Sequence, residues 1–331
     1  MADAGAGFDT PVLVTGDPHS PGAVAPRHFL SRIGNAASLS TQGSGRRELA
    51  EILANPSNPL TARVIVNRVW HAMFGRGLVG TPDNFGREGE RPSNPELLDY
   101  LATRFVNEGW SIKKLVRLIA TSQTFQQASV SNNLARETDP RNTLLHHYPA
   151  RRLPAESVRD SILSASGRLD EGLYGASIAP PRNDPQDYRR LFNGPLDGAG
   201  RRSIYTQITR MEGSRFLEIF DYPNPMATRG ARDVTNVPAQ ALAMLNDPFV
   251  LDQARVWGER LARDGAASVE DRVDSMFRTA LGRPATASER ARFTGLAAEV
   301  ASLQGVPRDS ATVWRDVAHA VFNLKEFVYI R

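Results

Sequence analysis

Apolar stripes bounded by helix-start and helix-stop residues recur along the chain, and they constrain its fold more than any other feature. In "SNPELLDYLATRF", Asn94 or Ser93 can cap a helix whose first residue is Pro95. Asn58 and Pro59 repeat this arrangement ahead of the apolar stretch "LTARVIVNRVWHAMF". The pattern predicts one helix after each of these two signals.

Helix-start and helix-stop residues also recur in the C-terminal third of the chain. The apolar stripe of "VEDRVDSMFRTALG" ends at Gly282, and Thr286 and Glu289 have the spacing of a capping box. Asn236 and Asp247 each stand just before a proline, where a helix can begin. We therefore expect four further helix boundaries in this region.

Other segments also have a helical period. "SIKKLVRLIATSQTF" puts Ile112, Leu115, Val116 and Ile119 on one apolar face, and "PAESVRDSIL" starts another helix. With 41% hydrophobic residues among 331, the chain has ample apolar material for a core. The predicted fold class is mainly α: a multi-helix globular domain with a long irregular loop region and at most a few short strands.

The irregular region begins at residue 168. Residues 168–214 contain frequent Gly and Pro, and within them only "RSIYTQITR" alternates well enough for a short strand. A second short strand is expected at Val12–Val14, in an otherwise extended segment. Long irregular stretches inside compact domains are often functional. We expect an extended N-terminal arm over 1–45 and a single helical domain over 46–331, with an irregular insert at 168–236.

A polar column stands in the apolar helix predicted after Asn58. Arg63, Asn67 and His71 recur every four residues and fall within about 80° of one another on a helical wheel. A helix that is apolar nearly all round is buried, so the column must find hydrogen-bond partners inside the protein. It forms either a buried network that ties the helix to the neighbouring chain or the lining of a cleft.

A second polar cluster lies in "HHYPARRLPAESVRDSIL". Glu156 and Asp160 are one helical turn apart, and Arg151 and Arg152 lie just upstream. Paired carboxylates can act as general acid and base. The same residues can equally form an ion-pair network without any catalytic role.

A third region, residues 201–246, is rich in side chains that can hold a polyol, a carboxylate or a sulfate group. The same groups can also fix the backbone of an irregular loop. Its candidate binding residues are Arg202, Tyr205, Asp221, Arg232, Gln240 and Asn246.

The net charge of +4 arises in the middle of the chain, where residues 141–232 carry 14 Lys and Arg against 10 Asp and Glu. From this excess we hypothesise that the Arg151–Asp160 helix start and the Arg201–Asn246 segment converge on one basic cleft that binds an acidic or polyhydroxylated ligand. The alternative is that the arginines all pair with Glu156, Asp160, Glu218 and Asp221. A concentrated basic stripe is missing, which argues against nucleic-acid binding.

Several classes of site are excluded by residue content. Without cysteine the chain has no disulfide, no thiolate nucleophile, no cysteine zinc site and no covalent haem. No H-E-x-x-H, His-x-His or G-x-S-x-G motif occurs, so we expect no metal site, no cofactor in this chain and no assignable catalytic residue. There is neither an apolar run long enough for a membrane span nor a visible signal peptide.

The segments "RRELAEILANPSNPLTARVIVNRVWHAMFGRG", "RRLPAESVRDSIL" and "FDYPNPMATRGARDVTNVPAQALAMLNDPFV" together resemble domain-of-unknown-function family 1553. This family forms the C-terminal domain of large multidomain proteins of planctomycete type. The resemblance implies upstream partners, namely a cytochrome-c-like domain and a second uncharacterised domain. It also implies a periplasmic or extracellular location. The family offers no established activity, so no catalytic residue is transferred.

Two functions are compatible with these observations. The first is a non-catalytic, extracytoplasmic binding or scaffolding module of a larger redox- or polysaccharide-related protein. The second is a hydrolase or lyase acting on a polysaccharide through Glu156 or Asp160. The first needs only a polar cleft, whereas the second needs a carboxylate with a perturbed pKa inside that cleft.

Overall fold

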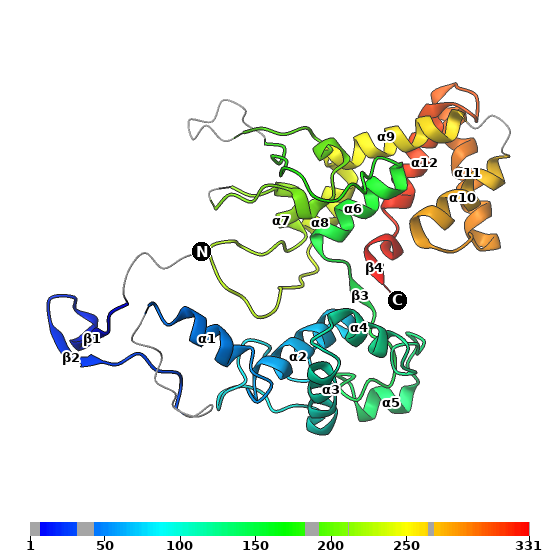
Figure 1. The fold of residues 1–331 in the computed structure, drawn as a ribbon. Coiled ribbons are helices and arrows are strands. Elements are labelled where there is room, and N and C mark those ends of the chain that lie inside the picture. Colours follow the sequence, from blue (N-terminus) through cyan, green and yellow to red (C-terminus); the bar gives the residue numbers. More distant parts are fainter. Residues whose placement is uncertain (1–6, 32–42, 183–191, 211, 264–267, 331) are drawn as a thin grey trace. The chain divides into compact units, whose positions relative to one another are not determined.

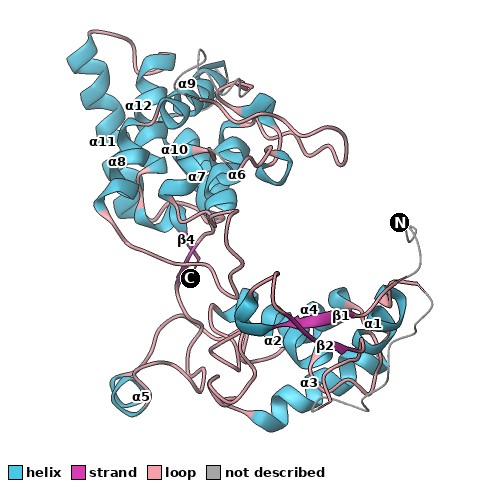
Figure 2. Cartoon of the chain, turned by 90° about the vertical axis from the view of Figure 1, so that its left-hand side faces the viewer, coloured by secondary structure: helices cyan, strands magenta, loops and turns pink. Residues whose placement is uncertain are grey.

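A computed structural model describes residues 7–31, 43–182, 192–210, 212–263 and 268–330. These residues fall into two compact units, Met1–Pro149 and Ala150–Arg331, here called the N-terminal unit and the C-terminal unit (Figure 1). The described part contains twelve α-helices and two sheets of two strands each, so the mainly α class is confirmed. Figure 2 shows how little of either unit is strand.

The N-terminal unit opens with a hairpin. Strands β1 (Thr10–Leu13) and β2 (Pro21–Ala25) pair antiparallel, with Thr10 opposite Ala25. The predicted strand at Val12–Val14 overlaps β1, but the arm is not extended throughout, because the chain folds back on itself between the strands. All five residues of β2 are exposed.

The described part of this unit also contains five helices: α1 (Arg46–Leu53), α2 (Thr61–Phe74), α3 (Pro95–Asn107), α4 (Ile112–Ala120) and α5 (Asn133–Thr138). The Asn58 side chain accepts hydrogen bonds from the N–H groups of Leu60 and Thr61, but α2 begins at Thr61 and its N-cap residue is Leu60, so the helix starts two residues later than predicted. Asn94 rather than Ser93 caps α3, accepting the N–H of Leu97. The helix starts are thus satisfied by the local side chains that predicted them.

The apolar face predicted for α4 is only half right. Leu115 and Ile119 are buried, but Ile112 is 54% exposed and Val116 is 38% exposed. A residue on an amphipathic stripe is buried only where another element covers it. Here only the line formed by Leu115 and Ile119 is covered.

The C-terminal unit contains seven helices among its described residues: α6 (Ala155–Ser166), α7 (Arg215–Ile219), α8 (Pro238–Asn246), α9 (Pro248–Arg263), α10 (Val269–Leu281), α11 (Ala287–Gln304) and α12 (Ala311–Phe322). Its small sheet pairs β3 (Arg151–Arg152) with β4 (Tyr329–Ile330). Helices α9 and α12 pack side by side at the centre (Figure 1). Their fully buried side chains include Trp257, Trp314 and Phe322. Helix α6 also packs against α9.

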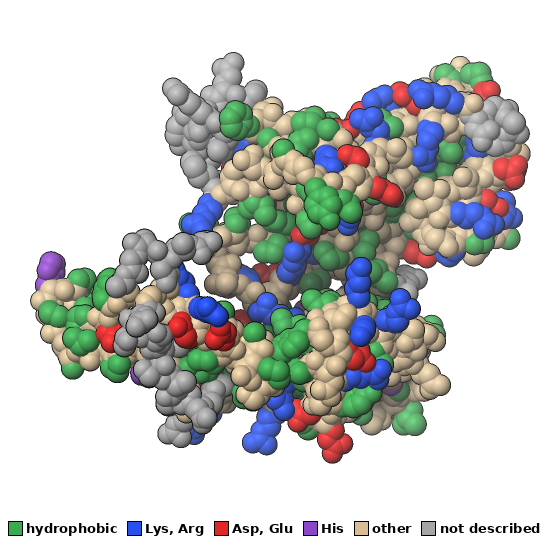
Figure 3. Space-filling view, viewed as in Figure 1, with side chains coloured by type: hydrophobic (Ala, Val, Ile, Leu, Met, Phe, Trp, Pro, Cys, Tyr) green, Lys and Arg blue, Asp and Glu red, His purple; other side chains and the backbone are tan. Residues whose placement is uncertain are grey.

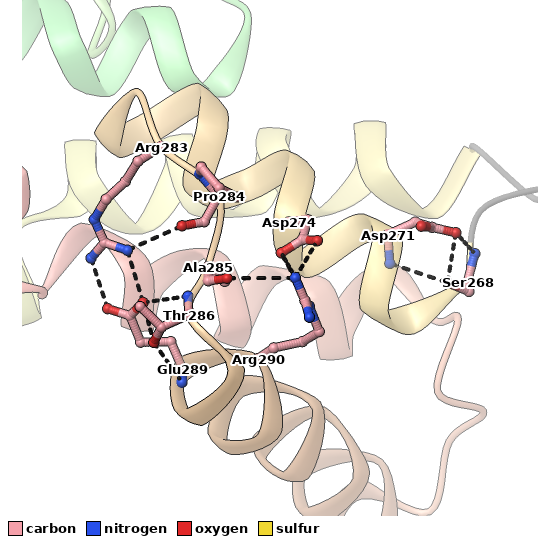
Figure 4. Close-up of polar contacts among 9 residues, drawn as sticks. All are labelled: Ser268, Asp271, Asp274, Arg283, Pro284, Ala285, Thr286, Glu289 and Arg290. Carbon is pink, nitrogen blue, oxygen red and sulfur yellow. Dashed lines mark hydrogen bonds and ion pairs between the residues drawn. The ribbon is translucent and has the colours of Figure 1, made fainter.

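Most predicted helix ends in this unit are confirmed. Gly282 ends α10 with a φ of 70°, and Asp247 accepts the N–H of Phe249 at the start of α9. The capping box of Thr286 and Glu289 is present (Figure 4). The cap predicted at Asn236 is wrong, because the residue before α8 is Val237 and no side chain caps that helix.

The α10–α11 hairpin carries further polar contacts. The Arg283 guanidinium donates to Glu289 at 2.7 Å and to Glu326 at 2.6 Å, and Arg290 donates to Asp274 at 2.7 Å (Figure 4 draws the Arg283–Glu289 and Arg290–Asp274 pairs). The hydrogen bonds from Arg283, together with those from Thr286, lower the pKa of Glu289 to about 2. The α10–α11 hairpin and its contact with Glu326 therefore concentrate several charge-assisted hydrogen bonds.

Residues 168–236 are irregular where the structure describes them, apart from the short helix α7 and two turns of 3-10 helix. The strand predicted in "RSIYTQITR" is wrong: Ser203–Tyr205 is one turn of 3-10 helix. Only the isolated bridges Asp170–Arg201 and Ile178–Thr206 give this segment strand-like pairing. The alternation is present in the sequence, but no neighbouring strand continues the ladder.

The compact units divide the chain between residues 149 and 150. The predicted division placed a boundary at 45/46 and treated 46–331 as one domain. That division stays a prediction, and the boundary between the compact units lies elsewhere, immediately before β3.

Candidate functional site

The polar column on α2 is a hydrogen-bond network. Asn67 is completely buried, and its amide accepts the N–H of Val79 at 2.8 Å and donates to the carbonyl of Val79 at 3.0 Å. Arg63 donates to Asp99 at 2.7 Å, and His71 is half-buried. The contacts of Asn67 satisfy the backbone of the loop after α2, and Arg63 ties α2 to α3.

The start of α6 is joined to the irregular segment through Arg152. Its side chain is only 5% exposed and donates to Asp221 at 2.6 Å and to the carbonyls of Phe220 and Thr235. Asp221 also accepts the N–H of Thr235 at 2.7 Å. Burial raises the pKa of Asp221, but the hydrogen bonds from Thr235 and Arg152 outweigh it and hold that pKa below its ordinary value.

Gln240 on α8 extends this cluster. Its side-chain amide donates to the carbonyl of Ile219 at 3.1 Å and to the hydroxyl of Thr235 at 3.1 Å. The ends of α7 and α8 are therefore linked to the loop that Asp221 and Arg152 hold. Every contact in this group satisfies a neighbouring backbone or side-chain partner.

Glu156 forms a bidentate ion pair with Arg232. The two guanidinium nitrogens donate to the two carboxylate oxygens at 2.6 and 2.9 Å. The Arg232 guanidinium also lies 5.9 Å from the centre of the Tyr222 ring. Both oxygens of Glu156 are thus already occupied by a fixed donor.

Asp160 and Arg159 hold the segment around Ser203. One oxygen of Asp160 accepts the N–H of Ser203 at 2.8 Å and its hydroxyl at 2.7 Å. Arg159 is buried, donates to the carbonyls of Arg201 and Asp197, and lies 5.6 Å from the Phe249 ring centre. Burial lowers the pKa of Arg159, although the charge of Asp160 opposes this shift.

The structure brings together six of the sequence-predicted residues in the C-terminal unit: Arg152, Glu156, Asp160, Asp221, Arg232 and Gln240. Arg151 is half-buried in β3, and Tyr205 stacks beneath Arg201 with 4.0 Å between the guanidinium carbon and the ring centre. Arg202 is exposed and does not join the cluster.

The two segments expected to form a basic cleft therefore do meet, but three of their arginines are already paired with carboxylates. Arg152 pairs with Asp221, Arg232 with Glu156 and Arg159 with Asp160. Within the described residues Glu218 forms no ion pair, so the pairing alternative holds for three of its four carboxylates. Figure 3 shows basic and acidic side chains interspersed on the face it presents, without a continuous basic stripe.

Sequence reasoning placed Arg159 beside Glu156 and Asp160 but not among the candidate binding residues, and it passed over Ser203. Arg159 stands between the buried Val158 and Ile162, so an arginine on the inner face of α6 was the available signal. Ser203 offered none, because its partner Asp160 lies 43 residues earlier in the chain.

A cavity of about 570 Å³ lies beside this cluster, between α6, α7 and the junction of α8 with α9. Phe216, Phe249, Leu196 and Leu242 provide much of its apolar lining. Its polar lining consists of Arg159, Arg182, Ser214, Arg215, Asn246 and Asp247. Of the sequence-predicted residues, Asn246 lies here.

The charged groups of this cavity differ in how they are held. Arg182 is almost completely buried and pairs with Glu212 at 3.2 Å. Arg215 is exposed, and its guanidinium makes no hydrogen bond or ion pair with any residue that the structure describes. Burial raises the pKa of Asp247, while the N–H of Phe249 and the charge of Arg215 act in the opposite direction.

Two smaller hollows occur in the same unit. One of about 490 Å³ runs along α6 past Ser157, Asp160, Ser161 and Arg202. The other, of about 330 Å³, lies between residues 206–218 and 222–226. Neither contains more than one arginine in its lining.

Among the described helices, none is long and apolar enough to cross a membrane. In the same part of the chain, no group of three or more His, Asp or Glu side chains gathers in a way that could hold a metal ion. That this chain binds no metal and no cofactor stays a prediction.

Comparison with known proteins identifies the family. The family model described as "Protein of unknown function (DUF1553)", PSD1, matches residues 45–297. No curated protein and no solved structure matches the chain. The match covers most of the chain, including α2, the α6 cluster and the cavity. The chain therefore belongs to the PSD1 family of proteins of unknown function.

Proposed function

We propose that this chain is a non-catalytic binding module whose ligand site is the 570 Å³ cavity beside α6. The observation that carries the proposal is the combination of an apolar lining with polar groups that lack a partner. Neither the Arg215 guanidinium nor the side-chain amide of Asn246 hydrogen-bonds to any described residue. Ligand sites are typically concave, mostly apolar and equipped with a few such polar groups. An acidic or polyhydroxylated ligand would supply the missing partners.

The alternative, a polysaccharide-acting hydrolase or lyase that uses Glu156 or Asp160, has less support. Both oxygens of Glu156 accept from Arg232, and one oxygen of Asp160 accepts twice from Ser203. A catalytic carboxylate must reach the proton or carbon on which it acts. Neither carboxylate lines the large cavity, and their present partners serve to hold the irregular segment.

The wider setting belongs to the same proposal. We propose further that the chain is a module of a larger extracytoplasmic protein, with a cytochrome-c-like domain and a second uncharacterised domain as its upstream partners, as the resemblance of its segments to this family implies. In that setting the module would contribute ligand binding or scaffolding, while any redox chemistry would belong to the partner domains.

The proposal is tested by filling the cavity. Ala239 lines it from an exposed position on α8, so Ala239→Phe can occupy the space without disturbing the core. Ala241, exposed on the same helix and outside the lining, gives the matched control Ala241→Phe. Calorimetric titration would use uronic-acid and sulfated oligosaccharides and small carboxylates.

We expect at least one compound of this panel to bind the wild type and Ala241→Phe equally and to lose binding in Ala239→Phe. If no compound binds, or if Ala239→Phe binds like the wild type, the cavity is not the ligand site and the proposal is wrong.

A further inference from the structure

We infer that the cavity takes an aliphatic carboxylate, with the carboxylate on Arg215 and the apolar body against the wall formed by Leu196, Leu242 and Ile219. This inference rests on the proposed function and narrows its ligand from an acidic or polyhydroxylated compound to an acidic one with an apolar body. It uses three features of the cavity: the exposed apolar wall, the unpaired guanidinium and the carboxylate of Asp247.

The apolar wall is the first feature. Leu242 is 57% exposed and Leu196 is 40% exposed, and both line the cavity together with Ile219. When an apolar ligand covers such side chains, the binding free energy becomes more favourable by about 25 cal/mol for each Å² of apolar surface buried. Hydroxyl groups placed against them would lose their water without gaining hydrogen bonds. The wall therefore favours a hydrocarbon body over a sugar.

A sugar ring also finds little room to stack on the two aromatic residues of the lining, Phe249 and Phe216. Phe249 is buried and the Arg159 guanidinium lies over its ring, 5.6 Å from the centre. Phe216 is likewise buried and packs edge-on against Phe249. The rings of Phe249 and Phe216 thus offer little free face on which a pyranose could stack.

The charge pattern is the second feature. Arg159 and Arg182 already donate to oxygens of the irregular segment, so they contribute fixed positive potential rather than free donors. Arg215 keeps its planar donors free, and guanidinium binds carboxylate in a bidentate geometry. An anionic head group therefore has one clear partner in this cavity.

The third feature is Asp247, which also lines the cavity and whose negative charge would repel a bound anion. Its carboxylate is held at the start of α9 by the N–H of Phe249, and it interacts electrostatically with Arg215. A ligand carboxylate on Arg215 would be repelled by an ionised Asp247. Asparagine caps helices as well as aspartate does, so Asp247→Asn removes the charge and retains the cap.

The experiment compares three probes by calorimetry at neutral pH. Octanoate has both the charge and the apolar body, 1-octanol has only the body, and gluconate combines a carboxylate with hydroxyl groups. We expect octanoate to bind at least about tenfold more tightly than either of the other two probes. The reason is that 1-octanol lacks the charged hydrogen bond to Arg215 and gluconate lacks the apolar contact.

Two substitutions that should change the affinity for octanoate in opposite directions sharpen the test. Arg215→Ala should weaken octanoate binding by about tenfold or more, and Asp247→Asn should strengthen it by about two- to fivefold, with 1-octanol unaffected by either. Arg292→Ala, which removes an exposed arginine on α11 outside the cavity, should leave all affinities unchanged.

The outcomes separate this inference from the proposed function. If gluconate or 1-octanol binds as tightly as octanoate, or if Arg215→Ala has no effect, the inference is overturned. The binding module survives that result provided Ala239→Phe abolishes the binding observed. If none of the three probes binds, the inference falls, and the wider panel then decides the proposed function.

Discussion

The α10–α11 hairpin and the irregular segment 168–236 are both held by arginine–carboxylate pairs, but over very different chain distances. In the hairpin, Arg283 and Glu289 are six residues apart, and Arg290 and Asp274 are sixteen apart. In the irregular segment, Arg152 reaches Asp221 across 69 residues. Local pairs form as soon as their turn forms, whereas distant pairs depend on the whole unit being packed.

The two regions also differ in burial. The side chain of Arg152 is 5% exposed, whereas that of Arg283 is 32% exposed. A buried pair that loses one partner leaves an uncompensated charge, whereas an exposed pair leaves a charge that water can solvate. The irregular segment should therefore be the more sensitive of the two to single substitutions.

The largest expected effect is that of breaking the buried pair. Arg152→Ala leaves Asp221 without its charged partner and should lower the free energy of unfolding by about 3–5 kcal/mol. Urea denaturation of the whole chain measures the change. Arg255→Ala, which removes an exposed arginine on α9, should cost about 0–1 kcal/mol and serves as the control. A cost for Arg152→Ala as small as that of the control would remove the distinction between the two regions.

The second comparison uses one glycine from each region. Gly200 and Gly282 both have positive φ, 75° and 70°, so alanine at either position should cost about 1–2 kcal/mol for the left-handed conformation. At Gly200 an added Cβ would also lie 2.2 Å from the carbonyl oxygen of Arg168, whereas at Gly282 it meets nothing within 4 Å.

We therefore expect Gly200→Ala to cost about 1–3 kcal/mol more than Gly282→Ala, because the backbone must move to relieve the overlap. Thermal and urea unfolding of the two variants measure this difference. Equal costs would mean that the irregular segment accommodates the methyl group without strain.

A smaller effect is expected from the local cap of α11. Thr286→Ala removes the side chain that accepts the N–H of Glu289 and should lower stability by about 1 kcal/mol. Thr286→Ser keeps the hydroxyl and should retain most of that stability. Urea unfolding distinguishes the variants, and an alanine variant as stable as the wild type would show that the cap contributes little.

The last expected effect is a pH dependence in the same hairpin. The folded pKa of Glu289 is about 2, below its ordinary value of 4.5, because Arg283 and Thr286 hydrogen-bond the ionised form. A lowered folded pKa adds stability that is fully present above pH 4.5 and is lost as the pH falls toward 2.

Glu289→Gln removes this group, so its stability deficit relative to the wild type should shrink steadily over that interval. Chemical unfolding at a series of pH values tests the trend. A deficit that stays constant from neutral pH to acid would contradict the assigned pKa.

Sequence reasoning succeeded wherever a residue acts on its near neighbours. Asn58, Asn94, Asp247 and Thr286 accept backbone N–H groups two or three residues away, so their positions alone predicted helix starts. It failed for "RSIYTQITR", which forms a 3-10 turn, and for Ile112 and Val116 on α4, which stay exposed although Leu115 and Ile119 on the same predicted face are buried.

The candidate site shows the same limit. The sequence placed Arg152 and Glu156 in one polar cluster and Asp221 and Arg232 in another and suggested that the two converge; the structure joins them, but as paired charges rather than as an open basic cleft. The cavity and the free guanidinium of Arg215 were not foreseen, because a cavity is defined by what surrounding elements leave unfilled.

By itself the sequence determined the mainly α class, most helix ends and the absence of cysteine chemistry, because each of these depends on residue type and on contacts within one helical turn. The tertiary structure alone decided which carboxylate each arginine meets and where the apolar lining opens into a cavity. Those outcomes join residues such as Arg152 and Thr235 that lie 83 positions apart, and only the packing of α6, α7, α8 and α9 brings such positions together.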